Sequence, residues 1–485
     1  MRWRLRSGRV ALQSLATEVD TGVDEQGLRR AFGPFTLTLV GVGNAIGAGI
    51  FVLTGTAAAL YAGPAITLAY IIAGVACVLT SLCYAEVSAL IPSAGGSFTY
   101  ARVTLGRFPA WLIGWCMVME YLIAASTVAA GWSGYAQDLL AQLGVNLPHA
   151  LTGAPFDLMD GKVVTSNRIV DVPAVLMITA CTGILLRGLR QSAIANAAMV
   201  SIKVAVIIAV IAVGSFYVTP VNWTPFVPAA SAAGHFGWGG VFTASAIAFF
   251  SYTGFEAMST AARESRNPTR DLPIALLASI GICIVLYVGT AVVLTGLVPY
   301  PKLATSSPLS TALRLASPKL TWLITIVNVG TVLGLGAAVL ISLYGQTRTF
   351  YSMAVAGYLP RAFAQVHPAL RTPTVATIWT GIGAAFVAGL LPIELLGELV
   401  SMGTLIAFAS VCLGVLILRR TYPEITRPFR VPLYPWIPLG GLLSCVGLMF
   451  SLPLITWANL TLWVAVGIAL YFALRLERRP QESTR

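Results

Sequence analysis

The chain has 485 residues, of which 57% are hydrophobic and only 10% are charged. Soluble domains carry about 25% charged residues, so this composition excludes a soluble enzyme, a disordered chain and a small disulfide-linked domain. The net charge of +12 would suit nucleic acid, but the arginines gather in short segments between long apolar runs. That placement is typical of the cytoplasmic loops of membrane proteins. The sequence therefore predicts an all-α membrane protein that binds no nucleic acid.

Membrane-spanning helices are expected wherever about 20 residues are predominantly apolar. About twelve such ranges are expected, and in chain order they are 34–60, 64–91, 108–137, 172–187, 192–218, 240–261, 273–297, 320–353, 372–391, 395–418, 434–453 and 456–476. An even number of spans leaves both termini on one side, and the arginine-rich connections make that side the cytoplasm. Residues 1–33 and 477–485 are then cytoplasmic segments, and no removable signal peptide is expected. We expect the protein in the plasma (inner) membrane.

Two predicted spans are unusual because glycine and small polar residues interrupt them in the middle. The first contains the run from Gly41 to Gly49, and the sixth contains Ser251, Thr253 and Gly254. Glycine is a poor residue for a helix interior, and unwound backbone is tolerated in lipid only where it lines a cavity or is buried in protein. Close helix packing through small residues is an alternative explanation that is compatible with the first. A phosphate-binding loop is disfavoured, because the glycine spacing does not fit GxGxxG.

The two interrupted spans occupy matching positions in two halves of five spans each. This arrangement is typical of secondary transporters built from inverted repeats, in which the substrate binds between broken helices. The predicted fold is therefore a first repeat over 34–218, a second repeat over 240–418 and two further helices over 434–476.

Several segments resemble the amino acid–polyamine–organocation superfamily of transporters, and they are 41–55, 85–100, 249–256, 264–268, 345–353, 397–405 and 427–432. The last two are the most specific and resemble the cationic amino-acid transporter branch. The resemblance implies a secondary active transporter of neutral or cationic L-amino acids that works by alternating access, with proton symport as its coupling. An exchanger without net proton movement and a sensor with a transporter fold remain alternatives. An enzyme is disfavoured because the three histidines fall in predicted loops.

An amino-acid zwitterion needs partners for its carboxylate and its ammonium group. Helix N-termini offer N–H groups and partial positive charge to the carboxylate, and helix C-termini offer carbonyls to the ammonium. We assign the carboxylate to the first break, with Gly43, Asn44, Ala45, Ile46, Gly47, Ala48 and Gly49. We assign the ammonium to the sixth span, with Phe249, Phe250, Ser251, Tyr252, Thr253 and Gly254. Asn44 and Thr253 depart from the family pattern and add polarity.

Lys203 and Glu120 are charged residues in the middle of the fifth and third predicted spans. A charged side chain at this depth is costly and usually functional. A buried amine can bind and release a proton, and the resemblance implies that a lysine on the fifth helix replaces a sodium ion between the first and eighth helices. Glu120 is expected to pair with Lys203, to bond a broken helix or to approach a cationic substrate. We therefore predict both residues in proton coupling, with simple structural pairing as the alternative.

Two residues are predicted to act as gates. The resemblance implies that Phe250 covers the bound substrate. Glu86 lies near the cytoplasmic end of the second span and is expected to gate or to pair with a loop arginine, for example Arg102 or Arg107. Weaker candidates for the inner cavity or the substrate pocket are Glu256, Asn328, Tyr344 and Met402. The expected partners are an L-amino acid, a proton and the bilayer, with no cofactor, no metal and no auxiliary subunit specified by the sequence.

Overall fold

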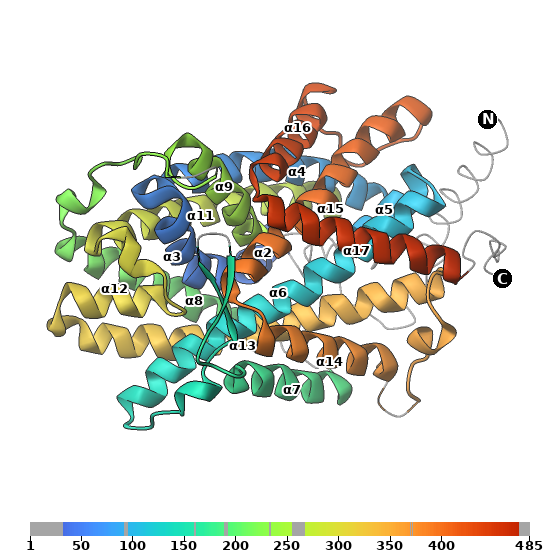
Figure 1. The fold of residues 1–485 in the computed structure, drawn as a ribbon. Coiled ribbons are helices and arrows are strands. Elements are labelled where there is room, and N and C mark those ends of the chain that lie inside the picture. The colour runs from blue at the N-terminus through green and yellow to red at the C-terminus, as the bar shows by residue number, and fades with distance from the viewer. Residues whose placement is uncertain are drawn as a thin grey trace.

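The computed structural model describes residues 33–91, 96–159, 162–188, 193–231, 234–254, 267–368, 370 and 372–474. Long helices run side by side through this part of the protein (Figure 1). Within the described ranges, seven helical segments are long and apolar enough to cross a membrane, and they are Gly49–Leu90, Arg107–Gln142, Ala198–Tyr217, Arg270–Leu297, Pro318–Val355, Ile393–Thr421 and Leu454–Ala473. Three shorter apolar helices accompany them, at Val172–Leu186, Thr374–Leu390 and Trp436–Ser451.

The first predicted span is interrupted, as its glycine run indicates. Helix α2 (Pro34–Ala45) ends where Ile46 turns to an extended conformation with φ −73° and ψ 95°. The chain then resumes as a π-helical turn, η1 (Gly49–Leu53), followed by α3 (Thr54–Ala57), a second π-helical turn η2 (Ala58–Ala62) and the 3-10 turn η3 (Gly63–Ala65). The unbroken α4 (Ile66–Leu90) comes next.

The next segment carries three elements that the sequence did not predict. A short helix, α5 (Gly96–Thr104), precedes the long α6 (Arg107–Gln142). The connection after α6 holds a 3-10 turn, η4 (His149–Leu151), and an antiparallel hairpin of β1 (Phe156–Met159) and β2 (Lys162–Thr165) that pairs Phe156 with Thr165. Asp171 then caps α7 (Val172–Leu186), because its Oδ1 accepts a hydrogen bond of 3.0 Å from the N–H of Ala174. Helix α8 (Ala193–Gly214) and η5 (Ser215–Tyr217) follow.

The sixth predicted span is also interrupted in its described part. After η6 (Pro220–Trp223), α9 (Gly237–Phe249) continues into one 3-10 turn, η7 (Phe250–Tyr252), and then stops because Thr253 is extended and Gly254 has a φ of +104°. Residues 255–261 of that predicted span, together with Glu256 and the terminal segments 1–32 and 475–485, lie outside the described residues. The described chain resumes with α11 (Pro268–Leu297).

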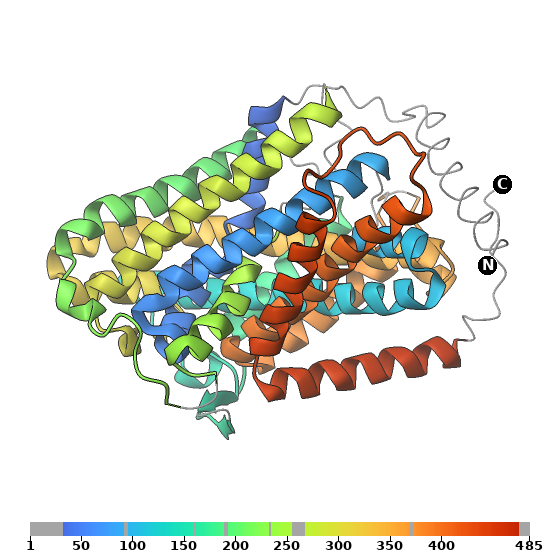
Figure 2. The same cartoon turned by 90° about the horizontal axis from the view of Figure 1, so that it is seen from above.

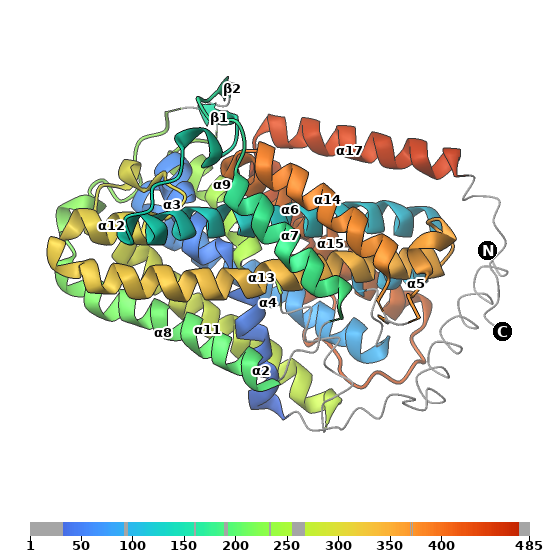
Figure 3. The ribbon, with the colours of Figure 1, turned by 90° about the horizontal axis from the view of Figure 1, so that it is seen from below.

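The remaining helices complete the bundle. After η9 (Tyr300–Leu303) comes α12 (Pro308–Ala316), a short helix that the sequence did not predict, which lies at the opposite end of the bundle from α5 (Figures 1 and 3). The rest are η10 (Pro318–Leu320), α13 (Thr321–Val355), η11 (Arg361–Ala364), α14 (Thr374–Leu390), α15 (Ile393–Thr421), α16 (Trp436–Ser451) and α17 (Leu454–Ala473). Helix α6 packs against both α13 and α15 in the centre, whereas α17 lies along the outer edge (Figures 2 and 3).

Candidate substrate and coupling site

The two interrupted segments meet each other at their breaks. A Cβ atom at Gly49 would lie 2.5 Å from Cα of Ser251, and one at Gly254 would lie 2.7 Å from the carbonyl carbon of Asn44. Real Cβ atoms do not come this close to backbone, so both contacts require glycine. Gly254 also needs glycine for its positive φ. The glycines therefore permit the two breaks to touch directly, which brings together the two halves of the site predicted from sequence.

Tyrosine hydroxyl groups bond the carbonyls at these breaks. The hydroxyl of Tyr70 donates to the carbonyl of Gly49 over 3.0 Å, and that of Tyr287 donates to the carbonyl of Ser251 over 2.8 Å. Tyr252 in turn donates to the carbonyl of Tyr70 over 2.8 Å. The carbonyl of Ser251 lies at the end of a helix, where intrahelical partners are missing, so Tyr287 supplies it with a donor. The carbonyl of Gly49 accepts from Tyr70 in addition to the N–H of Thr54. Tyr70 and Tyr287 were not among the residues predicted from sequence.

Lys203 projects from α8 onto the end of α2. Its side chain is buried, with 2% exposure, and its Nζ donates to the carbonyls of Gly43 and Ile46 over 3.0 and 2.9 Å. These carbonyls belong to the C-terminal end of α2, where the helix dipole is negative. On the other side, a Cβ atom at Gly334 of α13 would lie 2.7 Å from Cγ of Lys203. The amine is thus held between the break in the first helix and α13.

Most of the other residues assigned to the first break are enclosed, whereas Asn44 is half-buried and Gly47 has room beside it. Ala45, Ile46 and Ala48 are buried, and a Cβ atom at Gly43 would overlap the side chain of Val200. At Gly47, by contrast, the nearest atom to an added Cβ would be Cβ of Ala338 at 3.9 Å, which is an ordinary contact. Space for a small group therefore exists at Gly47.

Phe249 and Phe250 differ in their surroundings. Phe249 has 0% exposure and packs edge-to-face on Phe408, with ring centroids 5.6 Å apart. Phe250 retains 9% exposure. The hydroxyl of Thr253 donates to the carbonyl of Phe250 over 2.8 Å and so closes the end of the helix. Of the two rings, Phe250 is the less enclosed.

Glu120 joins α6 to α15. It is buried, and its Oε1 accepts a hydrogen bond of 2.8 Å from the hydroxyl of Thr404. A Cβ atom at Gly403 would lie 2.9 Å from Cβ of Glu120, so the glycine allows the two helices to approach. The amine of Lys203 donates to carbonyls of α2 instead. Glu120 therefore links α6 to α15, whereas Lys203 links α8 to α2.

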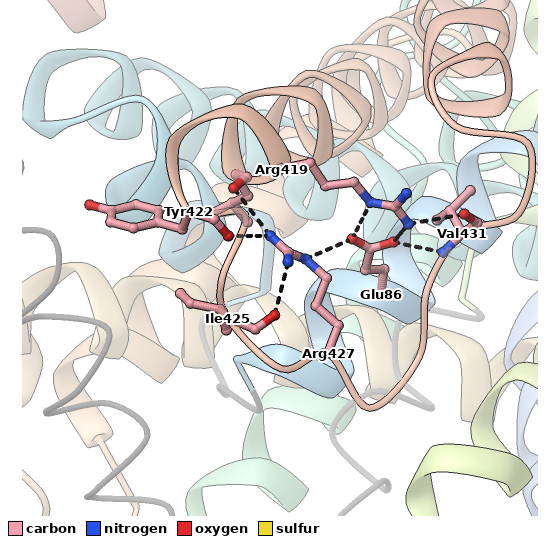
Figure 4. A network of polar contacts seen from close by, with 7 residues as sticks. Glu86, Arg419, Tyr422, Ile425, Arg427 and Val431 are labelled. Atoms are coloured by element: carbon pink, nitrogen blue, oxygen red, sulfur yellow. Dashed lines mark hydrogen bonds and ion pairs between the residues drawn. The ribbon is translucent and has the colours of Figure 1, made fainter.

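Glu86 is the centre of a charged cluster at the end of α4 (Figure 4). Arg419 donates from Nε to Oε1 over 2.9 Å and from Nη2 to Oε2 over 2.5 Å. Arg427 lies 3.3 Å from Oε1, and the N–H of Val431 donates to Oε2 over 2.7 Å. The expected pairing of Glu86 with a loop arginine is found in Arg427, but Arg102 and Arg107 were the wrong candidates for that partner. The partners of Glu86 come from α15 and the segment after it, which carries the motif at 427–432.

Arg427 also fastens that segment to the end of α15. Its guanidinium donates to the carbonyls of Ile425, Leu418 and Tyr422 over 2.9, 3.2 and 2.8 Å (Figure 4). Burial lowers the pKa of Arg427 below its usual value, and the neighbouring Glu86 opposes this effect. Glu86 and the two arginines form what we call the Glu86 cluster. It closes one end of the bundle around α4 and α15.

The weaker pocket candidates lie in different environments. Asn328 accepts a 2.5 Å hydrogen bond from Ser310 of α12, which ties it to the end of the bundle. Tyr344 is 38% exposed and lies under the guanidinium of Arg348, so its position does not fit a buried pocket. Met402 is fully buried in α15.

Comparison with known proteins identifies the family of the chain. The amino acid permease family matches residues 32–473. The chain belongs to this family. It is 42% identical over 445 residues to the methylthioribose transporter of Bacillus subtilis, an alignment that covers 92% of this chain and 93% of the relative. It is 39% identical over 449 residues to the branched-chain amino acid permease BcaP of the same organism, with 92% and 93% covered.

A plant relative extends the comparison to the cationic branch. The vacuolar cationic amino acid transporter 4 of Arabidopsis thaliana is 36% identical over 389 residues, which cover 80% of this chain and 63% of the relative. The resemblance to amino-acid permeases and cationic amino-acid transporters is therefore confirmed. This permease is a multi-pass membrane protein and a transporter, not an enzyme, and its family's activity is amino-acid transport.

Proposed function

We propose that this permease carries L-amino acids together with protons across the plasma membrane by alternating access. In this proposal about twelve helices cross the bilayer. Two inverted repeats, 34–218 and 240–418, rock around the point where Asn44 and Gly49 of the first break contact Ser251 and Gly254 of the second, which we call the crossing. Both termini and the Glu86 cluster face the cytoplasm, and α12 faces outward. The arginine-rich connections support this orientation.

The substrate binds where the two breaks touch. Its carboxylate takes the N–H groups at the start of η1, after Gly47, because the N-terminal end of a helix favours an anion. Its ammonium takes carbonyls at the end of α9, near Phe250 and Ser251. The direct contact of Gly49 with Ser251 supports this placement, since one small ligand can reach both ends. Phe250, the less enclosed ring, covers the ligand.

The bonding of Lys203 carries the proposal of proton coupling. A cation at this depth needs partners, and Lys203 has the carbonyls of Gly43 and Ile46. These carbonyls end the helix that opens the substrate site. Gain or loss of a proton on Nζ therefore changes how firmly α2 is held, which links protonation to the substrate. Glu120 has the supporting role of holding α6 to α15, and Glu86 holds the cytoplasmic gate.

The test is uptake of labelled amino acid by proteoliposomes with and without an inward proton gradient. Lys203→Ala is expected to abolish gradient-driven uptake. Lys302→Ala, at an exposed lysine in the α11–α12 connection, is the matched control and should transport like the parent. Full gradient-driven uptake by Lys203→Ala would refute the role of Lys203.

Two alternatives give different results in the same vesicles. An exchanger shows counterflow of labelled substrate but gains nothing from the gradient. A sensor shows neither counterflow nor uptake. Counterflow together with gradient-driven accumulation supports the proposed symport.

The side chain of the substrate is proposed to be neutral. A cationic side chain would need a nearby carboxylate, and Glu120, the acidic candidate within the described residues, already accepts a hydrogen bond from Thr404. Unlabelled leucine and alanine should then reduce the uptake of a labelled amino acid more strongly than unlabelled arginine and lysine do. Dominant competition by arginine would contradict this choice.

Methylthioribose is a second candidate substrate, because the relative that carries this name is 42% identical over 92% of the chain. It is an uncharged thioether sugar and would use neither helix end as a zwitterion does. Adding it to the competition panel decides between the two. If it competes and amino acids do not, the amino-acid assignment for this chain falls.

A further inference from the structure

A second buried carboxylate lies far along α15 from the Glu86 cluster. Glu398 is 1% exposed. Its Oε1 accepts a 2.5 Å hydrogen bond from the hydroxyl of Tyr61 in η2, and its Oε2 accepts one from the hydroxyl of Thr456 in α17. Within the described residues no lysine or arginine forms an ion pair with Glu398. In this part of the chain, two hydroxyl groups and no lysine or arginine therefore contact the carboxyl group of Glu398.

The position of Tyr61 connects this contact to both interrupted segments. Tyr61 lies in η2 near the end of the interrupted first helix, two residues before Gly63, whose φ is +58°. Its carbonyl accepts a 2.7 Å hydrogen bond from the N–H of Phe236, just before α9. The outer ends of both interrupted segments are thus tied to Tyr61, and Tyr61 is tied to α15 by Glu398. Any opening of the outer half of these segments away from α15 must break the Tyr61–Glu398 bond.

We propose that Glu398 is a proton-binding site at the outer gate, which favours the closed gate when protonated and the open gate when ionised. The inference rests on the proposed orientation and alternating access, and adds a proton site separate from Lys203. In the closed gate the carboxyl group is buried and no described lysine or arginine pairs with it, and burial without an ion pair favours the neutral form of a carboxyl group. A protonated carboxyl group keeps both contacts, because it accepts a hydrogen bond from one hydroxyl and donates its own hydrogen to the other. The closed gate therefore prefers the protonated form, and by linkage acid favours the closed form.

Other titratable groups near the pair are few. Glu394 is one turn earlier on α15 and acts on Tyr61, and His235 acts on Glu398. The ring of His235 stacks on Tyr61 with centroids 4.9 Å apart, and its Nδ1 is 2.9 Å from the carbonyl of Leu60. Helix α9 carries no titratable side chain, and the one on α17, Tyr471, is at the far end of that helix. A charged His235 would add to the stabilisation of ionised Glu398.

The experiment measures how open the outer gate is, without substrate or a gradient. Ala57, in α3, is 1% exposed, so a cysteine there is shielded while the gate is closed. The probe is a membrane-impermeant maleimide added to proteoliposomes, and the parent with its seven buried native cysteines gives the background. Because thiolate content itself changes with pH, the readout is the labelling rate of A57C/E398Q divided by that of A57C at each pH.

The expected ratio is about one fifth at about pH 7.5, because the uncharged amide mimics the protonated side chain, and it rises toward one at about pH 5.5, where protonation closes the parent as well. Tyr61→Phe in the A57C background should instead label faster than A57C, since it removes one hydrogen bond that holds the gate closed. Glu398→Asp and Glu394→Gln are controls that keep a carboxylate at position 398 and should retain the pH response of A57C.

A ratio of one at both pH values would overturn the proposal. So would a ratio above one, or any ratio that does not change with pH, because such a result reports altered packing and not protonation. Counterflow of amino acid in the same vesicles is measured in parallel, so a failure of transport is distinguished from a failure of the gate.

Discussion

The crossing of the broken helices and the Glu86 cluster hold the protein together by opposite means. At the crossing, glycines let backbone touch backbone, and tyrosine hydroxyls and the Lys203 amine bond carbonyls of the breaks. In the Glu86 cluster, one carboxylate binds the guanidinium groups of Arg419 and Arg427, which both lie far from Glu86 in the sequence. The crossing depends on shape and the cluster depends on charge.

This difference indicates which parts can move. Neutral hydrogen bonds between hydroxyl and carbonyl groups contribute about 1 kcal/mol each, so replacing them with hydrogen bonds to a ligand changes the free energy little. A buried carboxylate between guanidiniums is costly to separate once formed. We therefore expect the crossing to rearrange during transport more readily than the cluster does. The predictions below test this contrast.

Removing the charge of Glu86 should have the largest effect on stability. Glu86→Gln leaves two largely buried guanidiniums without their carboxylate, and breaking such a pair costs about 3–5 kcal/mol. Thermal unfolding in detergent should show a clearly lowered midpoint. The matched control is Asp138→Asn, which breaks the pair of Asp138 with the half-exposed Arg314. Exposed pairs contribute about 0–1 kcal/mol, so equal shifts for the two variants would contradict the special role of the Glu86 cluster.

The shape of the crossing is tested by two neighbouring glycines. Gly49→Ala places a Cβ 2.5 Å from Cα of Ser251 and must push the breaks apart. Overpacking of this kind costs about 1–3 kcal/mol, so uptake should fall about tenfold or more. Gly47→Ala has room, with its nearest neighbour 3.9 Å away, and should transport like the parent.

A larger residue at Gly47 tests whether the substrate binds at the first break. Gly47→Leu should fit the fold less easily and fill the proposed site, so substrate affinity should be lost although Gly47→Ala retains it. Binding is measured by counterflow at several substrate concentrations. Unchanged affinity in Gly47→Leu would remove the substrate from this break.

The sequence predicted the crossing better than the cluster for a physical reason. A helix break is a local property of the backbone, so the glycines near Gly47 and the extended Thr253 could be anticipated from composition. Lys203 is a charge within an apolar run and is visible without any partner. Glu86 was identified as a gate or as a partner of a loop arginine, but its partner Arg419 is 333 residues away, and nothing local specifies that pairing.

The sequence did not indicate that the hydroxyl groups of Tyr70 and Tyr287 bond the broken helices. An aromatic residue in an apolar helix looks the same whether its hydroxyl bonds a broken helix or lies at a lipid interface. The helices α5 and α12 were missed because both are short and lie outside the long apolar runs. Glu398 lies in the segment 397–405 that carries the family resemblance, and Tyr61 lies between two predicted spans, but only the fold brings the two side chains together.

The smallest predicted effect shows whether the hydroxyl bonds at the crossing matter individually. Tyr287→Phe removes the donor to the carbonyl of Ser251 and keeps the ring. One lost bond of this kind costs about 1 kcal/mol, so uptake should change about fivefold while the midpoint of thermal unfolding moves little. Tyr300→Phe is the control, because Tyr300 contacts Phe236 through its ring. If both variants transport like the parent, the glycine contacts alone hold the crossing. If Tyr287→Phe unfolds as readily as Glu86→Gln, the crossing is as rigid as the Glu86 cluster and the proposed contrast between them is wrong.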